Sequence, residues 1–227
     1  MKPLLKYRGG KSKEIPHLEK HIPQFDGRYI EPFFGGGALF FYLEPEKAII
    51  NDINSKLMAF YKGVKSDFGS LQKELSEIEK VYQRNRKKFE ELKAQTPNER
   101  VNDDNEALYY QIRDMFNDWT VKKYSDALLY FFINKTAYSG MIRYNNNGEY
   151  NVPFGRYPNF NTKLITEEHS AQLKKAKIFN LDYKMIFDMA DGNDFMFLDP
   201  PYDCVFNDYG NIDMMNGFDE KEHRRQI

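Results

Sequence analysis

Four short apolar runs end in polar residues, and this pattern predicts the strands of an α/β sheet. Two of them, Ala48-Ile49-Ile50 and Phe195–Leu198, are apolar without alternation, as in parallel strands that are covered on both faces. Turns and helical segments follow the runs, which favours a parallel α/β architecture. The four predicted strands are Arg28–Glu31, Lys47–Asn51, Lys177–Leu181 and Asp194–Leu198.

A long segment of helical character separates the second predicted strand from the third. Its apolar residues recur at steps of three and four, which is the pattern of amphipathic helices. Thr96-Pro97-Asn98 ends the first helix, and Ser125 is a good N-cap for the third. The predicted helices are Phe68–Leu92, Leu108–Trp119 and Ser125–Ile133.

A turn signal follows these helices. Asn147-Gly148 lies between extended-looking residues, a combination typical of a β-hairpin. We therefore interpret residues 56–165 as a helical insertion that ends in this hairpin. The remaining residues, 1–55 and 166–227, are expected to form one α/β domain.

Composition narrows the class of protein. The chain has 227 residues, of which 41% are hydrophobic and 30% charged, as in ordinary globular domains. The single cysteine, Cys204, cannot form an intramolecular disulfide, and with four histidines it offers little of a zinc site. No apolar run is long enough to span a membrane. We expect a cytoplasmic protein without a metal centre or a membrane partner.

Charge excludes a global attraction to nucleic acid, because 33 basic and 34 acidic side chains leave a net charge of −1. DNA or RNA binding would need local basic patches. The stretch Lys80–Lys93 is one, although a solvated helix face is the better interpretation of this stretch by itself. Aromatic residues make up 16% of the chain, and they serve both protein cores and base stacking.

A glycine-rich turn, Glu31-Pro32-Phe33-Phe34-Gly35-Gly36-Gly37, follows the first predicted strand directly. Three consecutive glycines let the backbone turn sharply and approach a ligand without a clash from Cβ atoms. Asn51-Asp52 ends the second strand, where an acidic side chain can accept hydrogen bonds from ribose hydroxyls. The GxGxxG fingerprint is absent. A nucleoside-type site and a plain turn with Asp52 as the N-cap of the next helix both remain open.

Asp199-Pro200-Pro201-Tyr202 follows the fourth predicted strand, at the end where open α/β sheets bind ligands. Two consecutive prolines remove backbone donors and stiffen the turn. The Asp199 carboxylate and the Pro200 carbonyl then offer acceptors for both hydrogens of an exocyclic amino group, which prepares the nitrogen to attack a sulfonium methyl. Tyr202 can stack on a base taken out of the duplex. Such catalysis works by positioning and needs no metal.

These motifs carry a resemblance to a known family that covers nearly the whole chain. The chain resembles the Dam-type (D12 class) adenine-N6 DNA methyltransferases. An aromatic-x-Gly-Gly-Lys motif near the N-terminus is similar to the segment that closes over the cofactor in that family. The matching motifs, in the family's order, are Tyr7-Arg8-Gly9-Gly10-Lys11, Glu31–Gly37, Asn51-Asp52-Ile53-Asn54, Asn180-Leu181-Asp182-Tyr183 and Asp199–Tyr202.

The resemblance implies a Rossmann-like methyltransferase sheet that binds S-adenosyl-L-methionine. By this likeness the glycine turn holds the methionine portion, Asp52 the ribose and Asp182 lines the adenine pocket. The implied cofactor-binding residues are Tyr7, Lys11, Glu31, Phe33, Gly35, Gly37, Asp52, Asp182 and Asp199. The implied catalytic residues are Asp199, Pro200, Pro201 and Tyr202.

The insertion is similar to the family's target-recognition domain, which binds double-stranded DNA. Arg143 would read a guanine edge, and Met141 or Tyr138 would wedge into the stack beside a flipped-out base. Relatives that methylate GATC commonly carry Asn where Ser139 stands, so the likeness does not fix the recognition sequence. The implied DNA-binding residues are Tyr138, Ser139, Met141, Arg143, Asn145, Pro153 and Tyr157.

The resemblance implies methyl transfer to the N6 amino group of adenine in double-stranded DNA, by base flipping. The setting would be bacterial or phage-encoded, with a cognate restriction endonuclease as a candidate partner. Methylation of another planar amine (cytosine N4, adenine in RNA or a glutamine side chain) is the nearest alternative. A non-catalytic DNA- or cofactor-binding remnant is the alternative from another class.

The chain stops at Phe218–Ile227, which resembles the start of the helix that follows the catalytic loop. Relatives continue with this helix and further strands, and without those strands the fourth strand would be an exposed apolar edge. We therefore expect the catalytic domain to be C-terminally incomplete. A fragment, an enzyme completed by a separate C-terminal fragment and an inactive remnant all fit this expectation.

Overall fold

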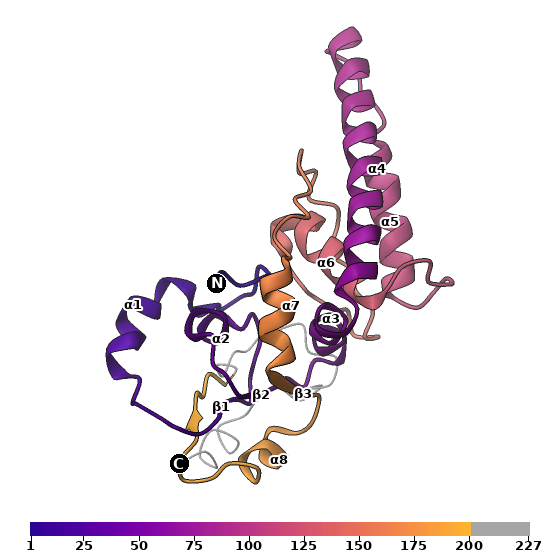
Figure 1. Ribbon diagram of the computed structural model, residues 1–227. Helices are drawn as coiled ribbons and strands as arrows, with labels where there is room; N and C mark the ends of the chain where they lie inside the picture. The colour runs from indigo at the N-terminus through magenta and orange to yellow at the C-terminus, as the bar shows by residue number, and fades with distance from the viewer. Residues whose placement is uncertain (201–227) are drawn as a thin grey trace.

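The computed structural model describes residues 1–200 of the chain and contains the predicted sheet (Figure 1). Four parallel strands lie in the order β3-β2-β1-β4. All four predicted strands are confirmed, each with slightly different ends. The strands are β1 (Tyr29–Glu31), β2 (Ala48–Asn51), β3 (Ala176–Phe179) and β4 (Phe195–Met196).

The two central strands explain why their sequences lack alternation. Every residue of β1 and β2 is buried, because helices cover both faces of the sheet. On one face, α2 (Ala38–Leu43), α3 (Ser55–Ser66) and α7 (Glu167–Lys174) enclose the large core. On the other face, α8 (Tyr183–Phe187) packs Ile186 against Ile30 and Ile49. The observed architecture is mixed α/β, as the sequence predicts.

The three predicted helices of the insertion are also present. Asp67, Asp103 and Ser125 accept backbone N–H groups at the N-terminus of α4, α5 and α6 respectively. The second helix ends three residues before Trp119, because Asp118 adopts a left-handed backbone with φ of 60°. The helices are α4 (Phe68–Gln95), α5 (Asp104–Phe116) and α6 (Asp126–Thr136).

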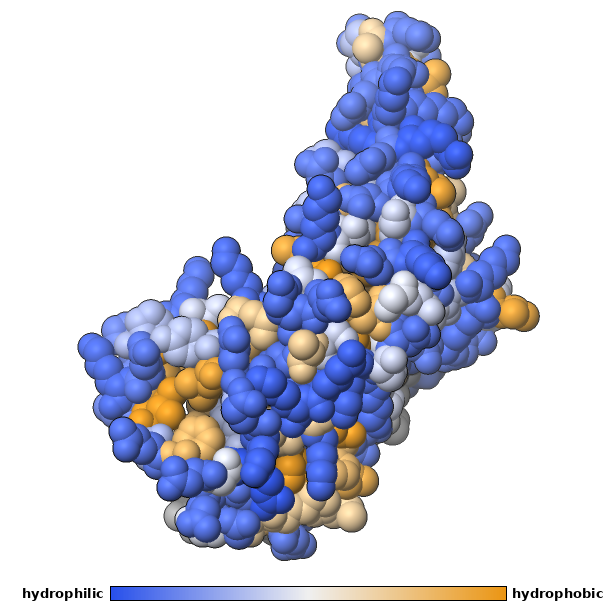
Figure 2. Space-filling model, viewed as in Figure 1, coloured by the Kyte–Doolittle hydropathy of each residue, from blue (hydrophilic) through white to orange (hydrophobic). Residues whose placement is uncertain are grey.

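The α4 and α5 helices project away from the sheet as a pair (Figure 1). The surface of this projection is mostly hydrophilic in the view of Figure 2. Ion pairs neutralise much of the basic stretch: Arg86 with Glu90 at 2.6 Å and Lys88 with Asp104 at 2.7 Å. The solvated-face interpretation of this stretch therefore holds.

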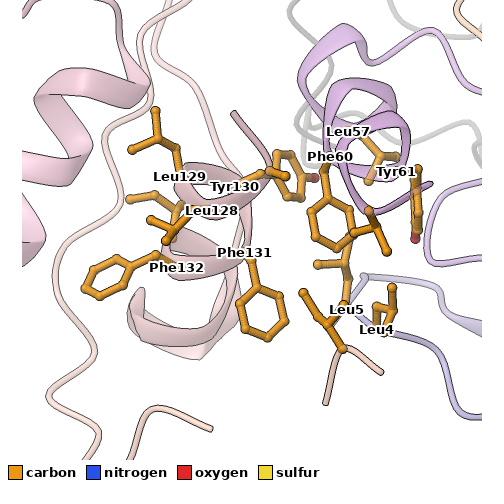
Figure 3. Packing of buried hydrophobic residues seen from close by; sticks show 14 of the residues in the cluster. Leu4, Leu5, Leu57, Phe60, Tyr61, Leu128, Leu129, Tyr130, Phe131 and Phe132 are labelled. Atoms are coloured by element: carbon orange, nitrogen blue, oxygen red, sulfur yellow. The ribbon is translucent and has the colours of Figure 1, made fainter. Parts of the chain in front are cut away.

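Helix α6 joins the insertion to the sheet domain. It is apolar on all sides, and nine of its residues are buried. Figure 3 shows Tyr130 and Phe131 of α6 facing Phe60 of α3, with Leu4 and Leu5 packed nearby. The Phe60 ring stacks on the Phe131 ring with 6.3 Å between centroids. One hydrophobic core thus extends from the sheet into the insertion.

Short helical turns near the N-terminus complete the described elements: η1 (Lys11–Lys13), α1 (Ile15–Leu18) and η2 (Glu19–His21), with η3 (Tyr138–Gly140) after α6. Within residues 1–200, no helix is both long enough and apolar enough to cross a membrane.

Candidate active site

The site begins with the side-by-side placement of β1 and β4. The Arg28 guanidinium donates two hydrogen bonds to the Asp194 carboxylate, from Nη2 at 2.5 Å and from Nε at 3.1 Å. Bidentate charged pairs of this kind fix orientation as well as proximity. The arginine holds the pKa of Asp194 down at about 2. The residues that directly precede the two strands are therefore held together.

The parallel pairing of β1 with β4 continues to the carboxyl ends of both strands. Ile30 lies beside Met196, and the Phe197 N–H donates to the Ile30 carbonyl at 2.9 Å. Since parallel neighbours end at the same edge of a sheet, Asp199 and the glycine turn after Glu31 meet there. The β1–β4 register therefore places the two motifs at the same edge of the sheet.

The glycine turn adopts a conformation that needs glycine. Gly35 and Gly37 have φ of 47° and 63°, in the left-handed region. A Cβ on Gly37 would lie 2.4 Å from the Phe34 ring. The Tyr61 hydroxyl of α3 donates to the Gly35 carbonyl at 3.1 Å and holds the turn from below. Sequence analysis missed Tyr61, because its spacing in a helix resembles that of any core residue.

Asp52 braces the same turn from β2. Its carboxylate accepts the Gly35 N–H at 2.8 Å and the Asn54 N–H at 2.9 Å. The alternative interpretation of Asp52 as an N-cap is wrong, because the Asn54 side chain caps α3 by accepting the Leu57 N–H. Burial raises the pKa of Asp52 to about 6, although the two backbone donors oppose the shift.

The end of β3 joins this network and explains why the strand stops early. The Asn180 amide donates to the carbonyls of Asp52 and Ile53 at 2.8 and 2.9 Å. Its neighbour Leu181 exchanges two hydrogen bonds with the Asn51 side chain. These two residues bond to the loop after β2 and leave the ladder.

Two more predicted cofactor residues lie beside this network. Asp182 is exposed, and its carboxylate accepts the Lys184 N–H at the start of α8. The Phe33 ring of the glycine turn lies 5.2 Å from the Tyr183 ring, centroid to centroid. The structure thus groups Phe33, Asp182 and Asp52 at the same end of the sheet.

The N-terminal motif covers the glycine turn. The Asn134 side chain of α6 exchanges hydrogen bonds with both backbone groups of Lys6, at 3.0 and 2.7 Å. From that anchor, the chain places the Tyr7 ring directly against Gly35, where an added Cβ would come within 2.8 Å of the ring. Sequence analysis missed Asn134, which resembles an ordinary polar residue late in a helix.

Lys11 links this motif to the proline-stiffened turn. Its ammonium lies 3.0 Å from the Asp199 carboxylate, and the two side chains are only 11% and 25% exposed. Burial raises the pKa of Asp199, and the nearby Lys11 charge opposes that shift. A lysine from one predicted cofactor motif and the predicted catalytic carboxylate therefore form one ion pair.

Glu31 lies at the base of the site. It is 3% exposed, and one of its carboxylate oxygens accepts a hydrogen bond from the Tyr29 hydroxyl at 2.7 Å. Burial raises the pKa of Glu31 well above its usual range, and the negative charges of Asp199 and Asp52 add to the shift. A protonated Glu31 can donate a hydrogen bond as well as accept one.

The predicted DNA-binding residues gather on the loop and turn that follow α6. Tyr138 and Met141 are 57% and 37% exposed, and Ser139 between them has φ of 55°. Arg143 is exposed, with its Nε donating to the Asn151 side chain at 3.1 Å. The Asn145 side chain, by contrast, bonds within the turn: its Oδ1 accepts the Asn147 and Glu149 N–H groups and so shapes the turn.

The two remaining predicted DNA-binding residues support this surface. The Pro153 carbonyl accepts the Tyr138 N–H at 2.9 Å. The Lys6 ammonium lies 4.7 Å from the centre of the Tyr157 ring, a cation–π contact. The predicted hairpin itself forms as a tight turn with a single antiparallel bridge between Tyr144 and Tyr150. Pro201 and Tyr202 of the predicted catalytic motif lie outside the described residues, as does the chain end Phe218–Ile227.

Comparison with known proteins decides between the classes of enzyme that this arrangement could serve. The family model of the D12 class N6 adenine-specific DNA methyltransferases matches residues 7–227. The chain belongs to this family. The match spans the glycine turn, the insertion and the proline-stiffened turn together, so the family resemblance seen in the motifs is confirmed.

Individual relatives agree with the D12 assignment. The type II methyltransferase M.CviBI of Paramecium bursaria Chlorella virus NC1A is 34% identical over 230 residues, which are 99% of this chain and 76% of the relative. M.MjaIII of Methanocaldococcus jannaschii, also named a type II methyltransferase, is 38% identical over 89% of this chain and 69% of its own length. A DNA adenine methylase of Haemophilus influenzae is 30% identical over 88% of this chain and 64% of the relative.

Proposed function

We propose that this D12-class adenine-specific DNA methyltransferase takes its methyl group from S-adenosyl-L-methionine and flips the target adenine out of double-stranded DNA. The observation that carries the proposal is the ion pair between Lys11 and Asp199 beside the Asp52-braced glycine turn. It joins a cofactor motif to a catalytic motif in one half-buried place.

The residues present suit a nucleoside cofactor. The left-handed glycines bring the backbone close to a ligand, and the Asp52 carboxylate keeps lone pairs for ribose hydroxyls beyond the two it gives to the backbone. Phe33 and Asp182 would line the adenine pocket, while Tyr7, Lys11, Glu31, Gly35 and Gly37 would hold the methionine portion. S-adenosylmethionine supplies, when bound, a methyl group on a positively charged sulfur.

Asp199 orients the amino group of the target. Its carboxylate and the Pro200 carbonyl accept the two N6 hydrogens, so that the nitrogen lone pair faces the methyl carbon. With the cofactor bound, N6 would gain the methyl group and release one proton to solvent. Lys11 keeps the carboxylate in place and balances its charge. By the family likeness, Pro201 would stiffen the turn, and Tyr202 would stack on the flipped base.

The insertion would select the site on DNA. Arg143 offers a bidentate donor for a guanine edge, and the exposed Tyr138 and Met141 would fill the space left by the flipped base. Ser139, Asn145, Pro153 and Tyr157 shape or contact the same surface. We assign residues 56–165 to target recognition, and residues 1–55 and 166–227 to catalysis. A cytoplasmic enzyme with a cognate restriction endonuclease fits the type II relatives.

The test is transfer of a tritiated methyl group from S-adenosylmethionine into unmethylated DNA, followed by nucleoside analysis. We expect N6-methyladenine, and we expect Asp199→Ala to lower kcat by at least about a hundredfold while leaving cofactor affinity within a few fold. Asp188→Ala removes an exposed carboxylate from α8 and serves as the matched control.

Each other outcome has a definite meaning. Methylcytosine as the product would favour the alternative planar amine. Binding of DNA and cofactor without transfer would favour the non-catalytic remnant. Full turnover by Asp199→Ala would remove this carboxylate from the mechanism.

A further inference from the structure

An asparagine at the end of α5 binds the turn that carries Arg143 from outside the turn. The Asn117 amide nitrogen donates to the Tyr150 carbonyl at 3.0 Å, and its oxygen accepts the Tyr150 N–H at 2.8 Å. A side chain that pairs with both backbone groups of one residue acts as a neighbouring strand would. This contact adds an outside support to the Tyr144–Tyr150 bridge and to the Asn145 hydrogen bonds within the turn.

The ring and the hydroxyl of Tyr150 are also held by contacts. It is 1% exposed, and its ring packs edge-on against Phe116 of α5 with 5.3 Å between centroids. Its hydroxyl donates to the Met141 carbonyl at 3.0 Å. Met141 belongs to the surface proposed to enter the DNA, so Tyr150 connects that surface to the end of α5.

A lysine of α3 links the end of α5 to the segment that follows the Asp52 motif. Lys56 follows the Asp52-Ile53-Asn54 motif by two residues, in the first turn of α3. Its ammonium donates to the Phe116 carbonyl and pairs with Asp118 at 3.2 Å. It also lies 4.5 Å from the centre of the Phe116 ring. Phe116 and Asp118 are the two neighbours of Asn117.

We propose that Asn117 and Lys56 are positioning residues that set the target-reading turn relative to the cofactor site and thereby determine sequence discrimination. This inference rests on the proposed function for the role of that turn. The route runs along the chain from the Asp52 motif into the first turn of α3, through the contacts of Lys56 with Phe116 and Asp118, and through Asn117 to Tyr150.

Loss of these contacts should lower discrimination between DNA sequences more than it lowers general affinity for DNA. Arg143 bonds Asn151, the residue directly after Tyr150, through its Nε and through its carbonyl. A small shift of Tyr150 therefore moves the guanidinium. Bidentate contacts to a base edge depend closely on geometry, whereas contacts to phosphates tolerate displacement.

The test compares Asn117→Asp and Lys56→Met with the wild-type chain. Aspartate keeps the oxygen that accepts the Tyr150 N–H but turns a second oxygen toward the Tyr150 carbonyl. Methionine keeps the length of the Lys56 side chain and removes its charge. Asn98→Asp, in the exposed connection between α4 and α5, and Lys87→Met, 80% exposed on α4, make the same chemical changes elsewhere.

The test needs the methylated site and three measurements. Sequencing of DNA from expressing cells first identifies the methylated site. Transfer rates are then compared on a duplex with that site and on duplexes with one base pair changed. Amide hydrogen exchange of peptides from residues 141–152 is measured without DNA, and cofactor affinity by calorimetry.

We expect Asn117→Asp to lower the discrimination ratio about tenfold and to speed exchange in residues 141–152, with cofactor affinity within twofold. Lys56→Met should also lower the discrimination ratio and speed exchange in residues 141–152. The double variant should lose no more discrimination than the stronger single variant, because both act through one route. The two controls should behave like the wild type.

Unchanged exchange and discrimination in Asn117→Asp would overturn the inference. A parallel loss of cofactor affinity and discrimination would do the same, since it would indicate general damage to the fold. Absence of methyl transfer by the wild type would instead count against the proposed function, and the exchange data would still decide whether Asn117 holds the turn.

Discussion

At the scale of single residues, Asp52 has one observed role and one proposed role. It braces the glycine turn through the Gly35 N–H, and it faces the place proposed for the ribose. Burial places its pKa at about 6, so this carboxylate changes charge close to physiological pH. Its ionisation state therefore bears on cofactor binding.

We expect cofactor affinity to fall as the pH drops from 7 to 5, because protonation removes the charge that attracts ribose hydroxyls. Below a pH of about 6 the loss should approach tenfold per unit. Calorimetric titration at a series of pH values measures it. Asp52→Asn should bind more weakly at pH 7 and show a flatter profile.

Protonation of Asp52 does not itself destabilise the fold. A raised native pKa means that the folded state binds the Asp52 proton more readily than the unfolded state. The contribution of this group to stability therefore rises as the pH falls from about 6 to about 4. A pH-independent affinity in the wild-type chain would contradict the role of Asp52 in cofactor binding.

At the scale of elements, the Arg28–Asp194 pair fastens the starts of β1 and β4. The Asp194 side chain is 2% exposed, so removal of its partner leaves a buried carboxylate without its counter-charge. The strand β4 has only two residues and one described neighbour, β1. We therefore expect the position of Asp199, which follows β4, to depend on the Arg28–Asp194 ion pair.

We expect Arg28→Met to lower the free energy of unfolding by about 2 kcal/mol in urea denaturation at pH 7. Methyl transfer should fall further than stability explains, because Asp199 loses its alignment. Arg84→Met, on the exposed face of α4, is the control and should change stability by less than about 0.5 kcal/mol. Equal activity of Arg28→Met and the wild type would refute the alignment argument.

The elements themselves were predictable, because periodicity and capping signals are local. The four strands, the three insertion helices and the Ser125 cap follow from neighbouring residues alone. Contacts between distant segments do not. Nothing in the sequence pairs Arg28 with Asp194, Asn134 with Lys6 or Asn117 with Tyr150, since each contact depends on how the chain folds back. The motifs therefore locate the site, whereas the residues that support it become visible only in the structure.

At the scale of the whole molecule, the insertion and the sheet domain share one core. Helix α6 packs against α3 on one side and α5 on the other, and the N-terminal Leu4 and Leu5 join the same cluster. The insertion and the sheet domain are thus proposed to have different roles, but their side chains pack in one continuous core. Such a core favours a single cooperative unit over two independent ones.

We expect one unfolding transition. The only tryptophan, Trp119, is 52% exposed and lies in the insertion, so its fluorescence reports on that part, whereas far-UV circular dichroism reports on all helices. Their urea midpoints should coincide. Phe131→Ala should shift both together, by about 3–5 kcal/mol in the free energy of unfolding. Separate midpoints would show that the insertion unfolds on its own.

The projection of α4 and α5 has a practical consequence. The buried residues of α4 all lie between Leu71 and Tyr82, although the helix has 28 residues and measures about 42 Å. Beyond that point, surface ion pairs and solvent support it. The far end is therefore a natural attachment point for a fluorophore, an affinity handle or a fused protein, because loop tips without core contacts tolerate insertion.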